Sequence, residues 1–206
     1  MNSPVNSSVY GSVNSPVNIL LVGVGGQGIV RAGDLIAEAA LHDGRDVKKS
    51  EIHGMSQRGG SVTSHVRYGR QVFSPVIVEG QADVLLSFER LEAIRYIAYL
   101  RPRGLAIVND QAILPAPVLA GAATYPEDLE SIFAERGRRL SIVDGTRLAT
   151  EAGNRLTVNV ALLGIVSRHL DLPEDAWQAA LKSHVKPAFL DVNRKAFDLG
   201  RKVASF

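Results

Sequence analysis

The residues with the clearest chemical potential lie in two glycine-rich segments near the N-terminus. The first matches the pattern G-x-G-x-x-G. Glycines in this pattern permit a tight turn, and the start of the following helix offers backbone amides to an anion. The segment therefore predicts either a phosphate or dinucleotide site or a tight strand-to-helix turn that holds no ligand. Its candidate binding residues are Gly23, Gly25, Gly26, Gln27 and Gly28.

Gln27 is unusual for a phosphate-binding turn. Its long amide side chain can fill the donor role itself or can form hydrogen bonds to a facing surface. Both possibilities favour a shaped interface over an open dinucleotide cradle.

The second segment follows one supersecondary unit later and is rich in polar side chains. Arg58 could hold a phosphate or carboxylate with two parallel hydrogen bonds, and His53 could carry a proton near neutral pH. The alternative is a mobile polar loop in which Arg58 pairs with an acidic neighbour. The density of polar groups favours a binding or interface role. The candidate residues are His53, Ser56, Gln57, Arg58, Gly59 and Gly60.

Glu51 stands where the ribose-binding carboxylate of a dinucleotide-binding domain is expected. With the first glycine segment it keeps open a free-standing, Rossmann-like oxidoreductase that binds a dinucleotide. No catalytic pair is evident downstream, so we assign no catalytic residue. His53 and His65 lack further ligands nearby, and we predict no metal site.

Apolar periodicity predicts a three-layer α/β/α sandwich with a mixed, mostly parallel sheet and a helical C-terminal region from about residue 146. In such a sheet the two glycine-rich loops share the carboxyl edge. The segments before and after Gly69-Arg70 are expected to form an antiparallel hairpin. The expected strands are 18–24, 46–52, 61–68, 72–78, 82–88, 105–109 and 140–143. The expected helices are 28–42, 89–100, 127–136, 146–152, 155–170, 174–185 and 188–203.

Composition limits the classes of function. Residues 1–17 are predicted to be a flexible low-complexity leader, and residues 18–206 a single α/β domain. A formal charge of +2 with scattered basic residues gives no case for nucleic acid or a membrane surface. The chain has no cysteine, which excludes disulfides, a thiolate nucleophile and cysteine-ligated clusters. No apolar run is long enough to span a bilayer, so we expect a cytoplasmic protein.

The two motifs together resemble the gamma-type subunit of 2-oxoacid:ferredoxin oxidoreductases, and within that group the beta subunits of indolepyruvate ferredoxin oxidoreductases. The likeness covers about residues 18–200. Its motifs are Gly23 to Gly28 and His53 to Val62, and supporting positions include Asn159 and Asn193.

The resemblance implies a pyruvate-ferredoxin oxidoreductase gamma (domain III-like) fold and an accessory role. In that family a 2-oxo acid is oxidatively decarboxylated to an acyl-coenzyme A, and the electrons pass to ferredoxin. Thiamine diphosphate, Mg and [4Fe-4S] clusters carry the chemistry. This chain has no cysteine and no Gly-Asp-Gly stretch followed by paired asparagines. We therefore expect these cofactors on partner subunits, with coenzyme A as co-substrate and the subunit inactive alone.

Overall fold

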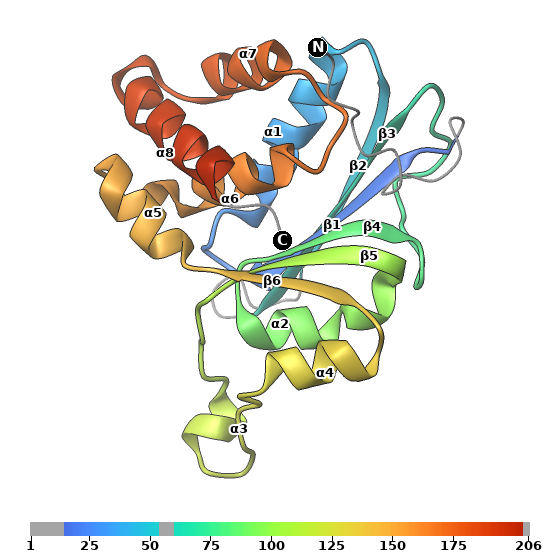
Figure 1. The fold of residues 1–206 in the computed structure, drawn as a ribbon, viewed down its shortest axis with the longest axis vertical. Helices are drawn as coiled ribbons and strands as arrows, with labels where there is room; N and C mark the ends of the chain where they lie inside the picture. The colour runs from blue at the N-terminus through green and yellow to red at the C-terminus, as the bar shows by residue number, and fades with distance from the viewer. Residues whose placement is uncertain (1–14, 54–59, 204–206) are drawn as a thin grey trace, which may run out of the picture.

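The computed structural model describes residues 15–53 and 60–203, and its centre is one six-stranded sheet. The strands lie in the order β2-β3-β1-β4-β5-β6 (Figure 1). Residues 1–14 of the predicted leader lie outside the described residues, and Val17 already belongs to the first strand. The strands are β1 Val17–Val24, β2 Asp46–His53, β3 Ser61–Gly69, β4 Ala82–Ser87, β5 Leu100–Asn109 and β6 Arg139–Val143.

Helices cover both faces of this sheet, which confirms the predicted three-layer sandwich. One face carries α1 and the C-terminal helices α5 to α8, and the other carries α2 and α4 (Figure 1). Each face has its own hydrophobic core, with Trp177 and Phe197 buried in the first and Phe133 in the second. The helices are α1 Ile29–His42, α2 Arg90–Arg95, α3 Ala116–Leu119, α4 Leu129–Glu135, α5 Gly145–Ala152, α6 Val158–Ser167, α7 Glu174–His184 and α8 Leu190–Lys202, with short 3-10 turns at Ile97–Tyr99, Arg155–Thr157 and Pro187–Phe189.

Strand direction decides which loops share an edge. Only β3 runs against its neighbours, because it pairs antiparallel with both β1 and β2, whereas β1, β4, β5 and β6 pair in parallel. The sheet is therefore mixed and mostly parallel, as predicted. β2 points the same way as β1, so the segment after β2 starts at the edge where the glycine turn follows β1.

The predicted strand at 72–78 is wrong. The antiparallel hairpin is formed by β2 and β3, and the segment after β3 crosses the sheet without ladder pairing. Side chains of β3 hold it there: Arg67 donates to the carbonyl of Ser74 (2.8 Å), and His65 Nδ1 accepts from the Ile77 amide (3.2 Å). Pro75 has no amide hydrogen to contribute to a ladder.

Other predictions were right in kind and wrong in length. The helix expected at 89–100 ends at Arg95, and β5 begins at Leu100 rather than at 105. The short helix α3 was not predicted; it belongs to an arm that projects from the sheet between β5 and α4 (Figure 1). In the part of the chain that the structure describes, no helix is long and apolar enough to cross a membrane.

Close packing of α6 on α8 places the C-terminal helices. A Cβ added at Gly164 would come within 2.0 Å of the Phe197 carbonyl oxygen, and one at Gly200 within 2.0 Å of the Ala161 carbonyl oxygen. The two helix backbones therefore touch at two glycines. This contact helps to place α6 beside the glycine turn.

Candidate functional site: the glycine turn and its groove

The turn between β1 and α1 depends on glycine for its backbone conformation. Gly26 and Gly28 have φ angles of 103° and 82°, in the region that disfavours other residues. Gly28 is the N-cap of α1, and no side chain caps that helix. The first amides of a helix have no acceptor within it, so this end of α1 can receive an anion.

The Gln27 side chain turns inward and bonds to its own chain. Its Oε1 accepts from the Val24 amide (2.7 Å), and its Nε2 donates to the carbonyl of Phe88 (2.9 Å) and to Oε1 of Gln111 (3.1 Å). A Cβ at Gly23 would lie 2.7 Å from Gln27 Oε1. The first glycine of the motif therefore makes room for this amide.

The two glycine-rich segments meet, as predicted. The Gly25 amide donates to the carbonyl of Gly60 (2.9 Å). The backbone of His53 ends β2 opposite Val62. Ser56, Gln57, Arg58 and Gly59 lie outside the described residues, and their part in the site stays a prediction.

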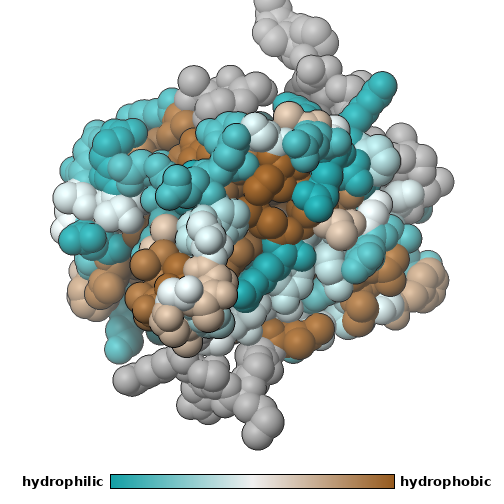
Figure 2. All heavy atoms as spheres, turned by 90° about the horizontal axis from the view of Figure 1, so that it is seen from below, coloured by the Kyte–Doolittle hydropathy of each residue, from teal (hydrophilic) through white to brown (hydrophobic). Residues whose placement is uncertain are grey.

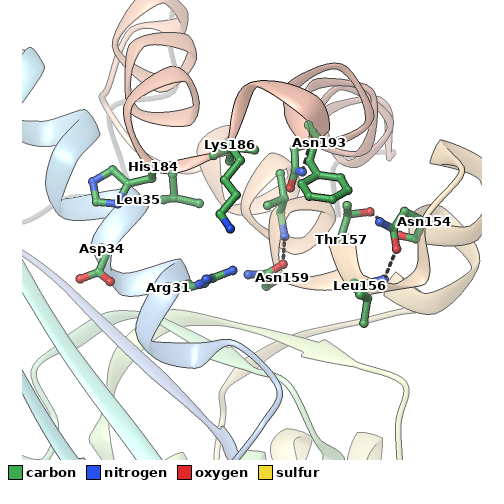
Figure 3. Close-up of a pocket in the computed structure, with 13 residues that line it drawn as sticks. Arg31, Asp34, Leu35, Asn154, Leu156, Thr157, Asn159, His184, Lys186 and Asn193 are labelled. Carbon is green, nitrogen blue, oxygen red and sulfur yellow. Dashed lines mark hydrogen bonds between the residues drawn. The ribbon is translucent and has the colours of Figure 1, made fainter.

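A groove runs from the glycine turn along α6 toward the end of α7. Its first part, about 660 Å³, is bounded by the turn and by Leu156 and Asn159. Its second part, about 530 Å³, shares Arg31, Leu156 and Asn159 with the first and is shown in Figure 3. The second part is lined by Arg31, Asp34, Leu35, Asn154, Leu156, Thr157, Asn159, Val160, His184, Val185, Lys186, Phe189 and Asn193.

Two cations give the groove its charge. The side chains of Arg31 and Lys186 extend into the same space beside Asn159 (Figure 3), and neither makes an ion pair with another described residue. The carboxylate of Asp34 is engaged by Lys49. Together with the uncapped end of α1, the two cations make this a groove for an anionic ligand such as a phosphate ester.

The groove also has apolar and amide groups. Leu156 is 87% exposed and Phe189 is 52% exposed at its rim. Asn159 packs against the turn, because its Nδ2 lies 3.0 Å from the position of a Cβ at Gly28. Asn193 donates to the carbonyl of Phe189 (2.7 Å). An elongated ligand with a phosphate end and a less polar body fits this lining.

Sequence reasoning missed Arg31 and Lys186. Arg31 had a detectable signal, because it lies three residues after Gly28 in the first turn of a helix that starts at an anion-binding motif. Lys186 had none, because only the packing of the C-terminal helices brings it to the groove.

The dinucleotide alternative is not supported. In a dinucleotide-binding domain the second strand lies beside the first, so its acidic residue reaches the ribose. Here β3 lies between β1 and β2, and Glu51 forms an ion pair with Lys49. The Gln27 amide also takes up the inner side of the turn.

Comparison with known proteins agrees with this geometry. The family model "Pyruvate ferredoxin/flavodoxin oxidoreductase" matches residues 18–203. The chain is 45% identical to the indolepyruvate oxidoreductase subunit IorB of Thermococcus kodakarensis over 91% of this chain and 95% of the relative. It is 30% identical to the pyruvate/ketoisovalerate oxidoreductases common subunit gamma of Pyrococcus furiosus over 74% of this chain and 77% of the relative. The crystal structure of a keto/oxoacid ferredoxin oxidoreductase gamma subunit from Geobacter sulfurreducens superposes with a TM-score of 0.66 at 27% identity, covering 89% of this chain and 95% of that one.

Proposed function

Because this chain belongs to the pyruvate ferredoxin/flavodoxin oxidoreductase family and is a gamma-type subunit of a 2-oxoacid:ferredoxin oxidoreductase, we propose that its complex oxidises an aryl pyruvate such as indolepyruvate. The product is the corresponding acyl-coenzyme A, and the electrons pass to ferredoxin. The 45% identity to an indolepyruvate oxidoreductase subunit over nearly the whole of both chains supports this substrate class.

The partner carries the redox cofactors in this proposal. The chain has no cysteine to ligate an iron–sulfur cluster. Among residues 15–53 and 60–203 no group of three or more potential metal-ligating side chains occurs. The described side chains of this chain therefore do not fit an iron–sulfur cluster or a magnesium diphosphate site. Thiamine diphosphate, Mg and [4Fe-4S] clusters are accordingly assigned to a partner subunit in the cytoplasm.

The groove is this chain's share of the coenzyme A path. Coenzyme A has a phosphorylated nucleotide end and a long, less polar arm, which match the cations and the apolar rim. Arg31, Lys186 and the start of α1 hold the phosphates, and the Gly25–Gly60 contact supports a role for the second segment at the same edge. For Arg58, which lies outside the described residues, we propose a role toward the partner's thiamine-bearing domain. The observation that carries this assignment is the presence, beside an uncapped helix start, of two cations that form no ion pair with another described residue.

An omission assay tests the subunit role and the substrate together. The partner subunit is assayed anaerobically for coenzyme A-dependent reduction of ferredoxin, with and without this chain, on indolepyruvate, phenylpyruvate, pyruvate and 2-oxoglutarate. The expected result is activity on the aryl pyruvates only when the chain is present. Full activity without it would instead make the chain a structural or regulatory module, and a preference for pyruvate would contradict the proposed substrate.

A further inference from the structure

Gln27 ties the glycine turn to the ends of neighbouring strands. Through Oε1 it accepts from the last residue of β1, and through Nε2 it donates to Phe88, the residue after β4. Its second Nε2 bond reaches Gln111, two residues after β5. One amide thus bridges three adjacent strand ends. An amide is the side chain that suits the position, because it both accepts and donates.

A second amide extends this arrangement. Asn109 Nδ2 donates to the same Phe88 carbonyl (3.3 Å) and to Gln111 Oε1 (3.3 Å). Its Oδ1 accepts from the Gly145 amide at the start of α5 (3.0 Å). Asn109 is buried. The Gln27 bridge therefore rests on a fixed surface.

The inner and outer sides of the turn have different roles. Gln27 occupies the inner side, and Gly23 is a glycine because a Cβ there would lie 2.7 Å from Gln27 Oε1 and 2.9 Å from Phe88 Cβ. On the outer side the residues of the turn from Gly25 to Gly28 line the groove, while the Oε1 and Nε2 atoms of Gln27 bond inward. We infer that Gln27 is a positioning residue, whose bonds hold the outer side of the turn in the conformation that receives coenzyme A. This inference rests on the proposed function for the identity of the ligand.

The positioning role of Gln27 can first be tested without any ligand. Gln27→Met removes the acceptor and both donors at similar length, whereas Gln27→Glu retains an acceptor for the Val24 amide. Gln71→Met, on an exposed residue after β3, is the matched control. Amide hydrogen exchange of the full chain should show faster exchange at Val24 in Gln27→Met only. Unchanged exchange at Val24 in Gln27→Met would overturn the inference.

The second readout is kinetic and uses the assembled complex. Gln27→Met should raise the KM for coenzyme A about 10-fold at nearly unchanged kcat, since a loosened turn must be ordered again on binding. Gln71→Met should match wild type.

If Arg31→Ala raises this KM and Gln27→Met does not, the positioning role is overturned and the groove assignment stands. If neither Arg31→Ala nor Lys186→Ala raises it, the coenzyme A assignment fails, and the exchange result alone decides whether Gln27 fixes the turn. If Gln27→Met does not fold, Gln27→Glu is used in its place. Gln27→Glu lacks the two bonds that Nε2 donates to Phe88 and Gln111, so an unchanged KM for coenzyme A in this variant would overturn the positioning role.

Discussion

The backbone amide of Gly25 donates a 2.9 Å hydrogen bond to the carbonyl oxygen of Gly60. This single bond joins the turn after β1 to the segment before β3, which are separated by a helix and a strand in sequence. It exists because β3 inserts antiparallel between β1 and β2, so that its first residue Ser61 lies opposite Val24, the last residue of β1. The groove for the proposed ligand adjoins this junction.

The cations of the groove should control affinity for coenzyme A. Arg31→Ala and Lys186→Ala are each expected to raise the KM for coenzyme A about 10-fold, or about 1.4 kcal/mol, with little change in kcat, because each removes a charge that meets a phosphate. The exposed residues Arg70 and Lys182 supply matched controls, Arg70→Ala and Lys182→Ala. The effect should shrink at high salt. Equal KM values in all four variants would remove the groove from the coenzyme A path.

Replacing Gly28 should lower the free energy of unfolding for two separable reasons. Gly28→Ala forces a φ of 82° on alanine and places a Cβ 3.0 Å from Asn159 Nδ2. Gly44→Ala imposes a similar φ of 73° with nothing within 4 Å. Both should lower the free energy of unfolding by about 1 kcal/mol from the backbone. Urea denaturation should show a larger loss for Gly28→Ala, and equal losses would mean that Asn159 moves away freely.

The pH dependence of stability should include a term from His65. Burial lowers the pKa of His65 below its usual 6.5, and its Nδ1 accepts from the Ile77 amide, which requires the neutral ring. Below about pH 6.5 His65 is therefore protonated in the unfolded chain before it is protonated in the folded chain. The free energy of unfolding falls as the pH is lowered through this range. The slope is at most about 1.4 kcal/mol per pH unit for one histidine.

His65→Asn isolates this term, since its Oδ1 can still accept from Ile77 but does not titrate. Urea denaturation between pH 5 and 7.5 should show a flatter profile for this variant. His169, whose pKa is also lowered by burial, keeps part of the dependence in both proteins. An unchanged slope in His65→Asn would contradict the account.

The projecting arm between β5 and α4 should loosen when its anchor is removed. Glu89 is buried and accepts from the Ile113 amide (3.0 Å) and from the hydroxyl of Tyr125. Burial and the hydrogen bond to Glu89 raise the pKa of Tyr125, so its hydroxyl stays a donor. Tyr125→Phe is expected to cost about 1 kcal/mol and to speed cleavage of the arm by thermolysin. Tyr99→Phe is the control, and equal cleavage rates would show that the arm does not depend on Tyr125.

The arm has an apolar character in addition to its anchor. Leu114 is 46% exposed and Leu119 is 71% exposed, and α3 has no buried residue. Figure 2, which views the molecule from below, shows hydrophobic residues gathered between hydrophilic ones on this side.

The sequence predicted the parts of the structure that depend on local pattern. The strand, turn and helix around Gly23 to Gly28 were placed correctly because apolar alternation, glycine and helical spacing all agree there. The meeting of the two loops followed from strand direction alone. The strand expected at 72–78 was wrong because alternation in a short segment does not reveal that Arg67 and His65 hold it from the neighbouring strand.

The groove was less predictable than the fold. Lys186 reaches it through the packing of the C-terminal helices. In that packing Gly164 and Gly200 let α6 and α8 meet backbone to backbone, a contact over more than 30 residues of sequence that no local pattern encodes. The inward direction of Gln27 depends likewise on the position of Phe88. The role of Arg58 in the site stays a prediction, and Arg58→Ala should raise the requirement for coenzyme A or weaken assembly of the complex.

This chain is a subunit of a larger enzyme, and its accessory role requires a partner that carries the cofactors. The most direct test is anaerobic affinity purification of the tagged chain from its native host, with mass spectrometry and cofactor analysis of what remains bound. We expect a stoichiometric partner that contains thiamine diphosphate and iron–sulfur clusters. Recovery of the chain alone, under conditions that preserve oxygen-sensitive enzymes, would contradict it.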